Sequence, residues 1–194
     1  MSVLVLKIFW QEGIFLAQIE HVISSIRILL NLAGADQQIK VEYGTSYELE
    51  GYKCKDPDSF VFDYIDVARL HNALLRKKIE KKETFCFFLM TRDRLFYNEN
   101  GFTKFVAGWA MQNVGCIVTA GTRAYLDNQV FKKSLDSVIM HELGHFFGLG
   151  HCDDITCVMY GLSNSKYLDL LRKPFCEKCL PKLLVCFKQS DSVT

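Results

Sequence analysis

The run from His141 to His151 constrains this chain more than any other part of it. It reads His-Glu-Leu-Gly-His-Phe-Phe-Gly-Leu-Gly-His. Residues four apart on a helix project from nearly the same face, so His141 and His145 can bind one metal ion with Glu142 beside it. Gly148 can adopt the left-handed conformation that ends a helix, which lets the chain turn and bring His151 as a third ligand. Three neutral imidazoles leave one tetrahedral position open, as in catalytic zinc sites. The run therefore predicts a zinc-dependent hydrolase.

The specificity of this pattern comes from its full length. A bare His-Glu-x-x-His can occur by chance, whereas Gly148 and His151 at fixed offsets make chance a poor explanation. A histidine that stands alone is more often a packed or surface residue with no metal. We interpret His21 and His71 in that way, because each lies alone in an amphipathic stretch.

Four cysteines follow the histidines in two close pairs, Cys152-x4-Cys157 and Cys176-x2-Cys179. This spacing is typical of a tetrathiolate zinc site, which has no open position and therefore serves a structural purpose. Disulfides and plain buried cysteines are the alternatives, although nothing in the sequence points to an oxidising compartment. The two clusters together predict two Zn²⁺ ions per chain, one catalytic and one structural.

The composition limits the kind of protein. A chain of 194 residues that is 49% hydrophobic can bury one good core. We expect a single catalytic domain over residues 1–194, with an N-terminal part (1–148) that carries the sheet and the active-site helix and a C-terminal part (149–194). The net charge of +1 argues against a nucleic-acid partner. No run has the length of a membrane span, and the apolar start lacks the features of a signal peptide, so we expect a cytoplasmic protein.

Alternating apolar patterns predict an α/β fold. The expected strands are Val3–Phe9, Ile39–Tyr43 and Thr84–Thr91, and the expected helices are Ile14–Leu32, Tyr64–Lys78 and Asn128–Phe147, with a long loop over Gly44–Phe62.

Two further extended segments, Phe105–Met111 and Val114–Ala120, are separated by only two residues. So short a connection suits an antiparallel hairpin. One strand of the pair would then lie at the edge of the sheet beside the metal, where a peptide substrate could add itself as another strand near Phe105–Met111. An edge strand without any ligand is the alternative.

The motifs together resemble a known family. The three-histidine pattern followed by a methionine, here Met159, is the metzincin signature. A cysteine directly after the last histidine, then Cys157, Met159 and the Cys176/Cys179 pair, resembles the archaemetzincins, a family of zinc metallopeptidases. Thr91–Phe96 and Phe105–Ala110 are also similar to segments that precede the active-site helix in that family. The resemblance covers about residues 84 to 187.

The resemblance implies a role for each site residue. His141, His145 and His151 would bind the catalytic zinc, Glu142 would be the general base and acid, and Met159 would form the methionine turn beneath the ligands. The second zinc would be held by Cys152, Cys157, Cys176 and Cys179. The implied fold is a metzincin-like twisted mixed sheet with one antiparallel edge strand, an active-site helix and a small zinc-stapled C-terminal lobe.

The implied activity is peptide-bond hydrolysis by a zinc-dependent metallopeptidase. Two other functions remain open on sequence grounds. The protein could bind zinc and peptides with little or no turnover, because ligand spacing predicts metal binding better than it predicts rate. The four-cysteine lobe could also be a nucleic-acid-binding zinc ribbon, although the charge balance disfavours it.

Overall fold

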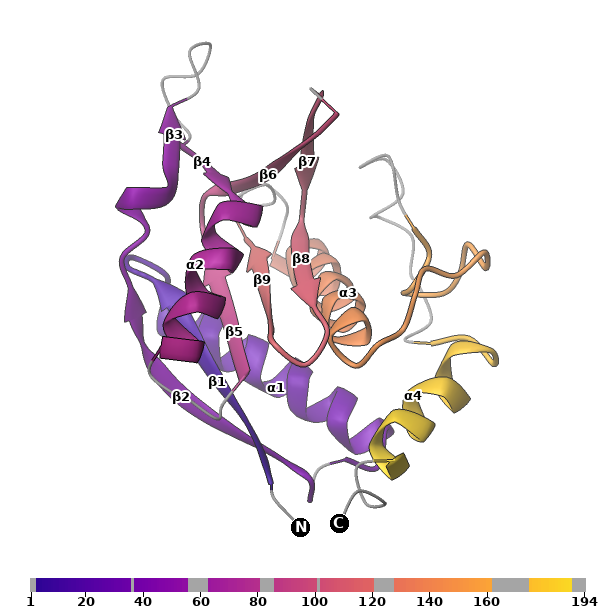
Figure 1. Ribbon diagram of the computed structural model, residues 1–194. Coiled ribbons are helices and arrows are strands. Elements are labelled where there is room, and N and C mark those ends of the chain that lie inside the picture. Colours follow the sequence, from indigo (N-terminus) through magenta and orange to yellow (C-terminus); the bar gives the residue numbers. More distant parts are fainter. Residues whose placement is uncertain are drawn as a thin grey trace.

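A five-stranded mixed sheet forms the centre of the molecule (Figure 1). The computed structural model describes residues 3–35, 37–55, 63–80, 86–100, 102–120, 128–161 and 175–189. The strand order is β2 (Ile39–Tyr47), β1 (Leu4–Gln11), β5 (Cys86–Thr91), β9 (Gly115–Thr119) and β8 (Gly108–Met111). The first four strands are parallel, whereas β8 pairs antiparallel with β9 at the edge. The predicted α/β fold with one antiparallel edge strand is therefore confirmed.

A second, four-stranded sheet was not expected from the sequence. It has the order β3 (Lys53–Lys55), β4 (Asp63–Asp66), β6 (Arg94–Glu99) and β7 (Phe102–Val106). Parts of it lie in the predicted loop and at the predicted start of the second helix, so those two predictions were wrong. Strands of three or four residues are too short to show the alternation by which a strand is recognised.

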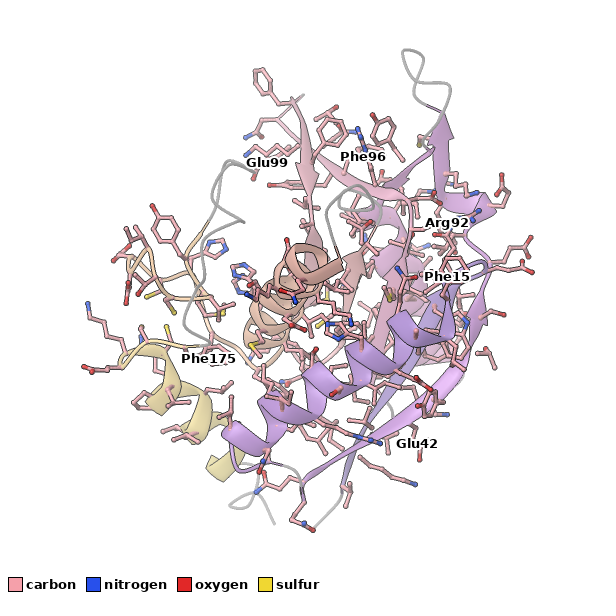
Figure 2. All side chains as sticks on the ribbon, turned by 180° about the vertical axis from the view of Figure 1, so that it is seen from behind. Phe15, Glu42, Arg92, Phe96, Glu99 and Phe175 are labelled. Carbon is pink, nitrogen blue, oxygen red and sulfur yellow. The ribbon has the colours of Figure 1, made fainter. Side chains whose placement is uncertain are left out.

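Helices cover both faces of the central sheet (Figures 1 and 2). α1 (Leu16–Leu32) and α3 (Asn128–Phe146) contact each other on one face, and α2 (Val67–Glu80) packs on the other. β5 shows the two-sided burial directly. Phe88 and Met90 belong to the core under α1 and α3, while Phe87 and Leu89 belong to the core under α2. This explains why the strand is an unbroken apolar run.

The three predicted helices are present. α1 and α2 begin two or three residues later than predicted, whereas α3 begins at Asn128 as predicted. α2 begins at Val67 rather than at residue 64, and the Asp66 carboxylate accepts a hydrogen bond from the Arg69 backbone N–H at 3.0 Å. That contact caps the helix, and an aspartate three residues before the donor is a recognisable start signal. None of the helices in the described ranges is long and apolar enough to cross a membrane.

The C-terminal segments pack onto the same core as α1 and α3. That buried cluster includes Met159, Phe175 and, from α4 (Cys179–Gln189), Leu183. The division into parts at residues 148 and 149 remains a prediction. Figure 2 shows Phe175 where the segment before α4 approaches α3.

Candidate metal centre

The end of α3 is shaped as its sequence predicts. The helix stops at Phe146, and Gly148 has a φ of +91°. The Leu149 N–H donates to the Gly144 carbonyl at 2.8 Å and the Gly148 N–H to the His145 carbonyl at 2.9 Å. These two bonds form a Schellman motif, which turns the chain sharply back at the helix end. The turn leads directly to His151.

The three histidines converge in space. The ligand atoms of His141, His145 and His151 lie within 4.8 Å of one another, and the Nε2 atoms of the first two are 3.0 Å apart. Nitrogens on a tetrahedral zinc, each about 2.0–2.1 Å from it, are separated by about 3.4 Å. The spacing therefore fits a single zinc ion.

Backbone carbonyls hold two of these rings in the orientation that metal binding needs. His141 Nδ1 lies 2.7 Å from the Val158 carbonyl oxygen, and His145 Nδ1 lies 2.7 Å from the Leu149 carbonyl oxygen. A carbonyl can only accept, so each Nδ1 carries the proton and each Nε2 keeps its lone pair. Burial also lowers the pKa of His145, which favours the neutral imidazole that binds metal.

Glu142 is buried next to this cluster, with 6% of its surface exposed. Burial raises the pKa of its carboxyl from 4.5 to about 8. The Cys116 thiol on β9 donates to the Glu142 backbone carbonyl, with Sγ 3.4 Å from the oxygen, which ties this turn of α3 to the sheet. A carboxyl that ionises near neutral pH can both accept and return a proton.

Met159 lies directly beneath the helix that carries the histidines. It is fully buried, and a Cβ added at Gly144 would come within 2.3 Å of its Sδ. Only a glycine on the helix leaves room for this close contact. The position agrees with the apolar floor that the methionine turn implies.

The four cysteines form a second cluster. The ligand atoms of Cys152, Cys157, Cys176 and Cys179 lie within 4.8 Å of one another, and all four thiols are free. The Sγ atoms of Cys152 and Cys176 are 3.6 Å apart. That is far longer than a disulfide bond, and it fits sulfurs that are each about 2.3 Å from a shared zinc.

Backbone N–H groups point at the sulfurs of this second cluster. Cys157 Sγ accepts from the Met159 N–H and from the Cys176 N–H, each at 3.4 Å. Burial opposes ionisation of Cys176, but hydrogen bonds from the N–H groups of Cys179 and Lys178 and from the thiols of Cys152 and Cys179 together lower its pKa to about 7. The donors thus favour the thiolate form, which is the form that binds zinc.

The two clusters are joined through one short segment. The Cys152 N–H donates to the Met159 carbonyl at 2.8 Å, and Cys152 and Tyr160 form an isolated parallel bridge. The residue that follows the third histidine is therefore bonded to the methionine turn.

The expected edge strand is present but shorter than predicted. Phe105–Met111 was predicted as one strand, whereas the structure assigns Phe105 to β7 of the second sheet and Gly108–Met111 to β8. Ala107 lies between the two strands, where the chain passes from one sheet to the other (Figure 1). The hairpin of β8 with β9 is as predicted.

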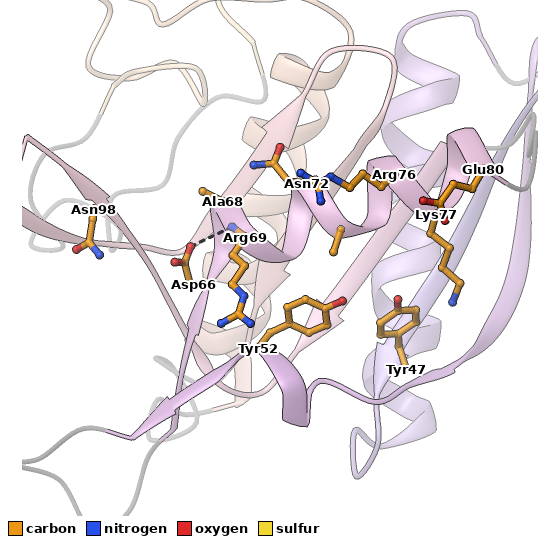
Figure 3. A pocket seen from close by; sticks show the side chains of 11 residues that line it. Tyr47, Tyr52, Asp66, Ala68, Arg69, Asn72, Arg76, Lys77, Glu80 and Asn98 are labelled. Atoms are coloured by element: carbon orange, nitrogen blue, oxygen red, sulfur yellow. Dashed lines mark hydrogen bonds between the residues drawn. The ribbon is translucent and has the colours of Figure 1, made fainter.

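A separate cavity of 850 Å³ lies on the α2 side of the molecule (Figure 3). It is lined by α2 together with Tyr47, Tyr52 and Asn98, and it contains none of the predicted site residues. The Lys77 ammonium lies 5.0 Å from the centre of the Tyr47 ring. The lining is strongly charged, since it includes Asp66, Arg69, Arg76, Lys77 and Glu80.

Sequence reasoning missed the groups that orient the site. The carbonyls of Val158 and Leu149 are backbone atoms and leave no mark in the sequence. Gly108 of β8, which lies against Glu142, was also missed. Its only signal was a glycine inside an otherwise extended segment, which can indicate close approach of another group.

Two histidines on a helix and a third after the turn that ends it, beside an antiparallel edge strand and above a buried methionine, form the arrangement of the metzincins. Residues 65–184 match the model of peptidase family M54. The chain belongs to this family, and the resemblance to archaemetzincins is confirmed.

Individual relatives agree with that assignment. An archaemetzincin of Pyrococcus horikoshii is 42% identical over 57 residues, which are 29% of this chain and 30% of the relative. The match thus spans about a third of the length of such curated relatives. The crystal structure of an archaemetzincin from Methanopyrus kandleri covers 96% of both chains with a TM-score of 0.74 and 23% identity. A zinc-dependent peptidase from Methanocorpusculum labreanum covers 92% of this chain and 99% of its own, with a TM-score of 0.64 and 22% identity. These two likenesses show the fold.

Proposed function

We propose that this protein is a zinc-dependent metallopeptidase that hydrolyses peptide bonds. His141, His145 and His151 hold the catalytic zinc, and Glu142 is the general base. Cys152, Cys157, Cys176 and Cys179 hold a structural zinc. The observation that carries the proposal is the convergence of three imidazoles, with the buried carboxyl of Glu142 one residue after His141 and against the edge strand.

The chain's own groups account for the proton movements. Zinc, when bound, polarises the scissile carbonyl and lowers the pKa of water. Glu142 accepts a proton from the attacking water on its carboxylate and then passes that proton to the leaving amine. Burial raises the pKa of this carboxyl, so it holds the accepted proton more readily than an exposed glutamate does until the amine takes it. The carbonyls of Val158 and Leu149 keep the two helix imidazoles in place throughout.

The substrate is a peptide or protein in extended conformation. Among the strands of the described ranges, β8 pairs only with β9, so the N–H and C=O groups on its other side can pair with a substrate strand. Residues 108–111 therefore replace the longer Phe105–Met111 as the proposed binding strand.

The alternative function is peptide binding with little or no turnover. Such a protein has no use for an ionisable carboxyl buried one residue after a metal-binding histidine, and burying a carboxyl costs free energy. Glu142 therefore favours hydrolysis.

We also propose a cytoplasmic location. The second cluster binds zinc only through reduced thiols, and the cytoplasm keeps thiols reduced.

Three variants test the function. The zinc content of the purified protein is measured together with its digestion of a mixed peptide library. We expect two zinc ions per chain and cleavage that Glu142→Ala abolishes while both ions remain bound. Glu20→Ala, the same change at an exposed position of α1, is the matched control and should cleave normally. Unchanged cleavage by Glu142→Ala would refute the role of the carboxylate. Unchanged zinc content in Cys176→Ser/Cys179→Ser would refute the structural site.

A further inference from the structure

Gly108 is the buried first residue of the edge strand β8. Its backbone is held in place by the neighbouring strand, because Gly108 pairs with Val118 and the Thr119 N–H donates to the Ala107 carbonyl at 2.9 Å. The strand therefore cannot retreat from α3 at this point without losing its pairing with β9.

The side chain of Glu142 occupies the space where a side chain of residue 108 would be. A Cβ added at Gly108 would lie 2.4 Å from Glu142 Cγ, 2.6 Å from Oε1 and 2.7 Å from Cδ. Non-bonded carbon atoms pack at about 3.5–4.0 Å, so all three distances are overlaps. The carboxylate thus rests directly on the bare backbone of the edge strand.

The contact at Gly108 differs from that at other glycines of the sheet. At Gly115 an added Cβ would meet the backbone oxygen of Phe87 at 2.5 Å, so a substitution there would disturb the sheet itself. At Gly108 the three nearest atoms all belong to the side chain of Glu142. A methyl group at position 108 therefore displaces the Glu142 side chain and leaves the pairing of the strands intact.

The Glu142 side chain cannot avoid this overlap by a small shift of the helix backbone. Its backbone carbonyl is bonded to the Cys116 thiol on β9, and the flanking Leu143 is fully buried. The closest overlap is with Cγ, and Cγ moves only if χ1 changes to another of the few rotamers that a helix allows. Such a change moves the carboxylate away from its place against Gly108.

We propose that Gly108 is a positioning residue for the hydrolysis, because its missing side chain provides the place in which the Glu142 carboxylate is held. This inference rests on the proposed function for its catalytic consequence. The steric coupling between the two residues holds whether or not the protein cleaves peptides.

The first test measures catalysis by the zinc-loaded protein. We expect Gly108→Ala to keep two zinc ions and a similar KM and to lose about 100-fold in kcat, as misplacement of a reacting group by about 1 Å does. Gly51→Ala is the matched control, since nothing lies within 4 Å of a Cβ added there. A wild-type kcat in Gly108→Ala would overturn the proposal.

The second test needs no activity. Melting temperatures are measured for the wild type, Gly108→Ala, Glu142→Ala and the double variant. We expect Gly108→Ala to lower the melting temperature of the wild type, and to leave it unchanged or raise it in the Glu142→Ala background, where the overlapping atoms are gone. Equal shifts in both backgrounds would overturn the proposal. If the wild type cleaved nothing, the proposed function would fail and this cycle alone would decide the role of Gly108.

Discussion

His71 should make the stability of the fold depend on pH. Its side chain is 1% exposed between α2 and the central sheet, 5.2 Å from the ring of Phe87. Neither ring nitrogen has a hydrogen-bond partner among the described residues. Burial lowers the pKa of His71 from 6.5 to about 4. Between pH 6.5 and about 4, His71 is therefore protonated in the unfolded chain but neutral in the folded protein.

The sign and size of the effect follow from this shift. Well above pH 6.5 the imidazole is neutral in both states and the full stability is present. As the pH falls from 6.5 towards 4, the unfolded chain gains a proton and the free energy of unfolding decreases. Each pKa unit corresponds to about 1.4 kcal/mol, so the whole shift is worth about 3 kcal/mol, of which about 2 kcal/mol is lost by about pH 5.

Urea denaturation at pH 7.5 and pH 5 measures this effect for the wild type and for His71→Leu. The variant removes the titrating ring but keeps an apolar side chain in the core, so it should lose about 2 kcal/mol less between the two pH values. Loss of zinc from the histidine cluster at low pH affects both proteins alike and cancels in the difference. Equal losses in the two proteins would refute the reasoning.

Two other substitutions test the packing around the metal sites. Gly144→Ala places a methyl group 2.3 Å from Met159 Sδ. Although alanine favours helices, we expect this overlap to lower the free energy of unfolding by about 1–3 kcal/mol. Urea denaturation measures the change, and a more stable variant would contradict the packing. Cys157→Ser removes a buried thiolate ligand and should reduce the zinc content from two to one, measured by atomic emission; two ions in the variant would contradict the tetrathiolate site.

The site was largely predictable because its ligands are close in the sequence. His141 and His145 share a helix face by periodicity alone, and the chain from Gly148 to Cys152 is too short to take the third histidine elsewhere. The unbroken apolar run of β5 likewise indicated a strand. Local geometry decides all these features, so local sequence reveals them.

Features that depend on distant contacts were not predictable. The second sheet pairs β4 with β6 across about thirty residues, and the four residues of β4 are too few to show a pattern. His71 gave no sign of a perturbed pKa, because its burial is produced by a strand that follows it in the chain. Gly108 is important only because α3 places Glu142 against it. In each case a tertiary contact, and not the local sequence, gives the residue its environment.

The position of the four-cysteine cluster explains how a structural zinc can serve a catalytic one. The Val158 carbonyl orients His141, and the next residue, Met159, donates its N–H to the Cys157 sulfur. The Met159 carbonyl accepts from the Cys152 N–H. The peptide units that hold the imidazole are thus bonded on both sides to cysteines of the second cluster. A metal that fixes those sulfurs also fixes the carbonyl, and an imidazole held in one orientation loses less entropy when it binds zinc.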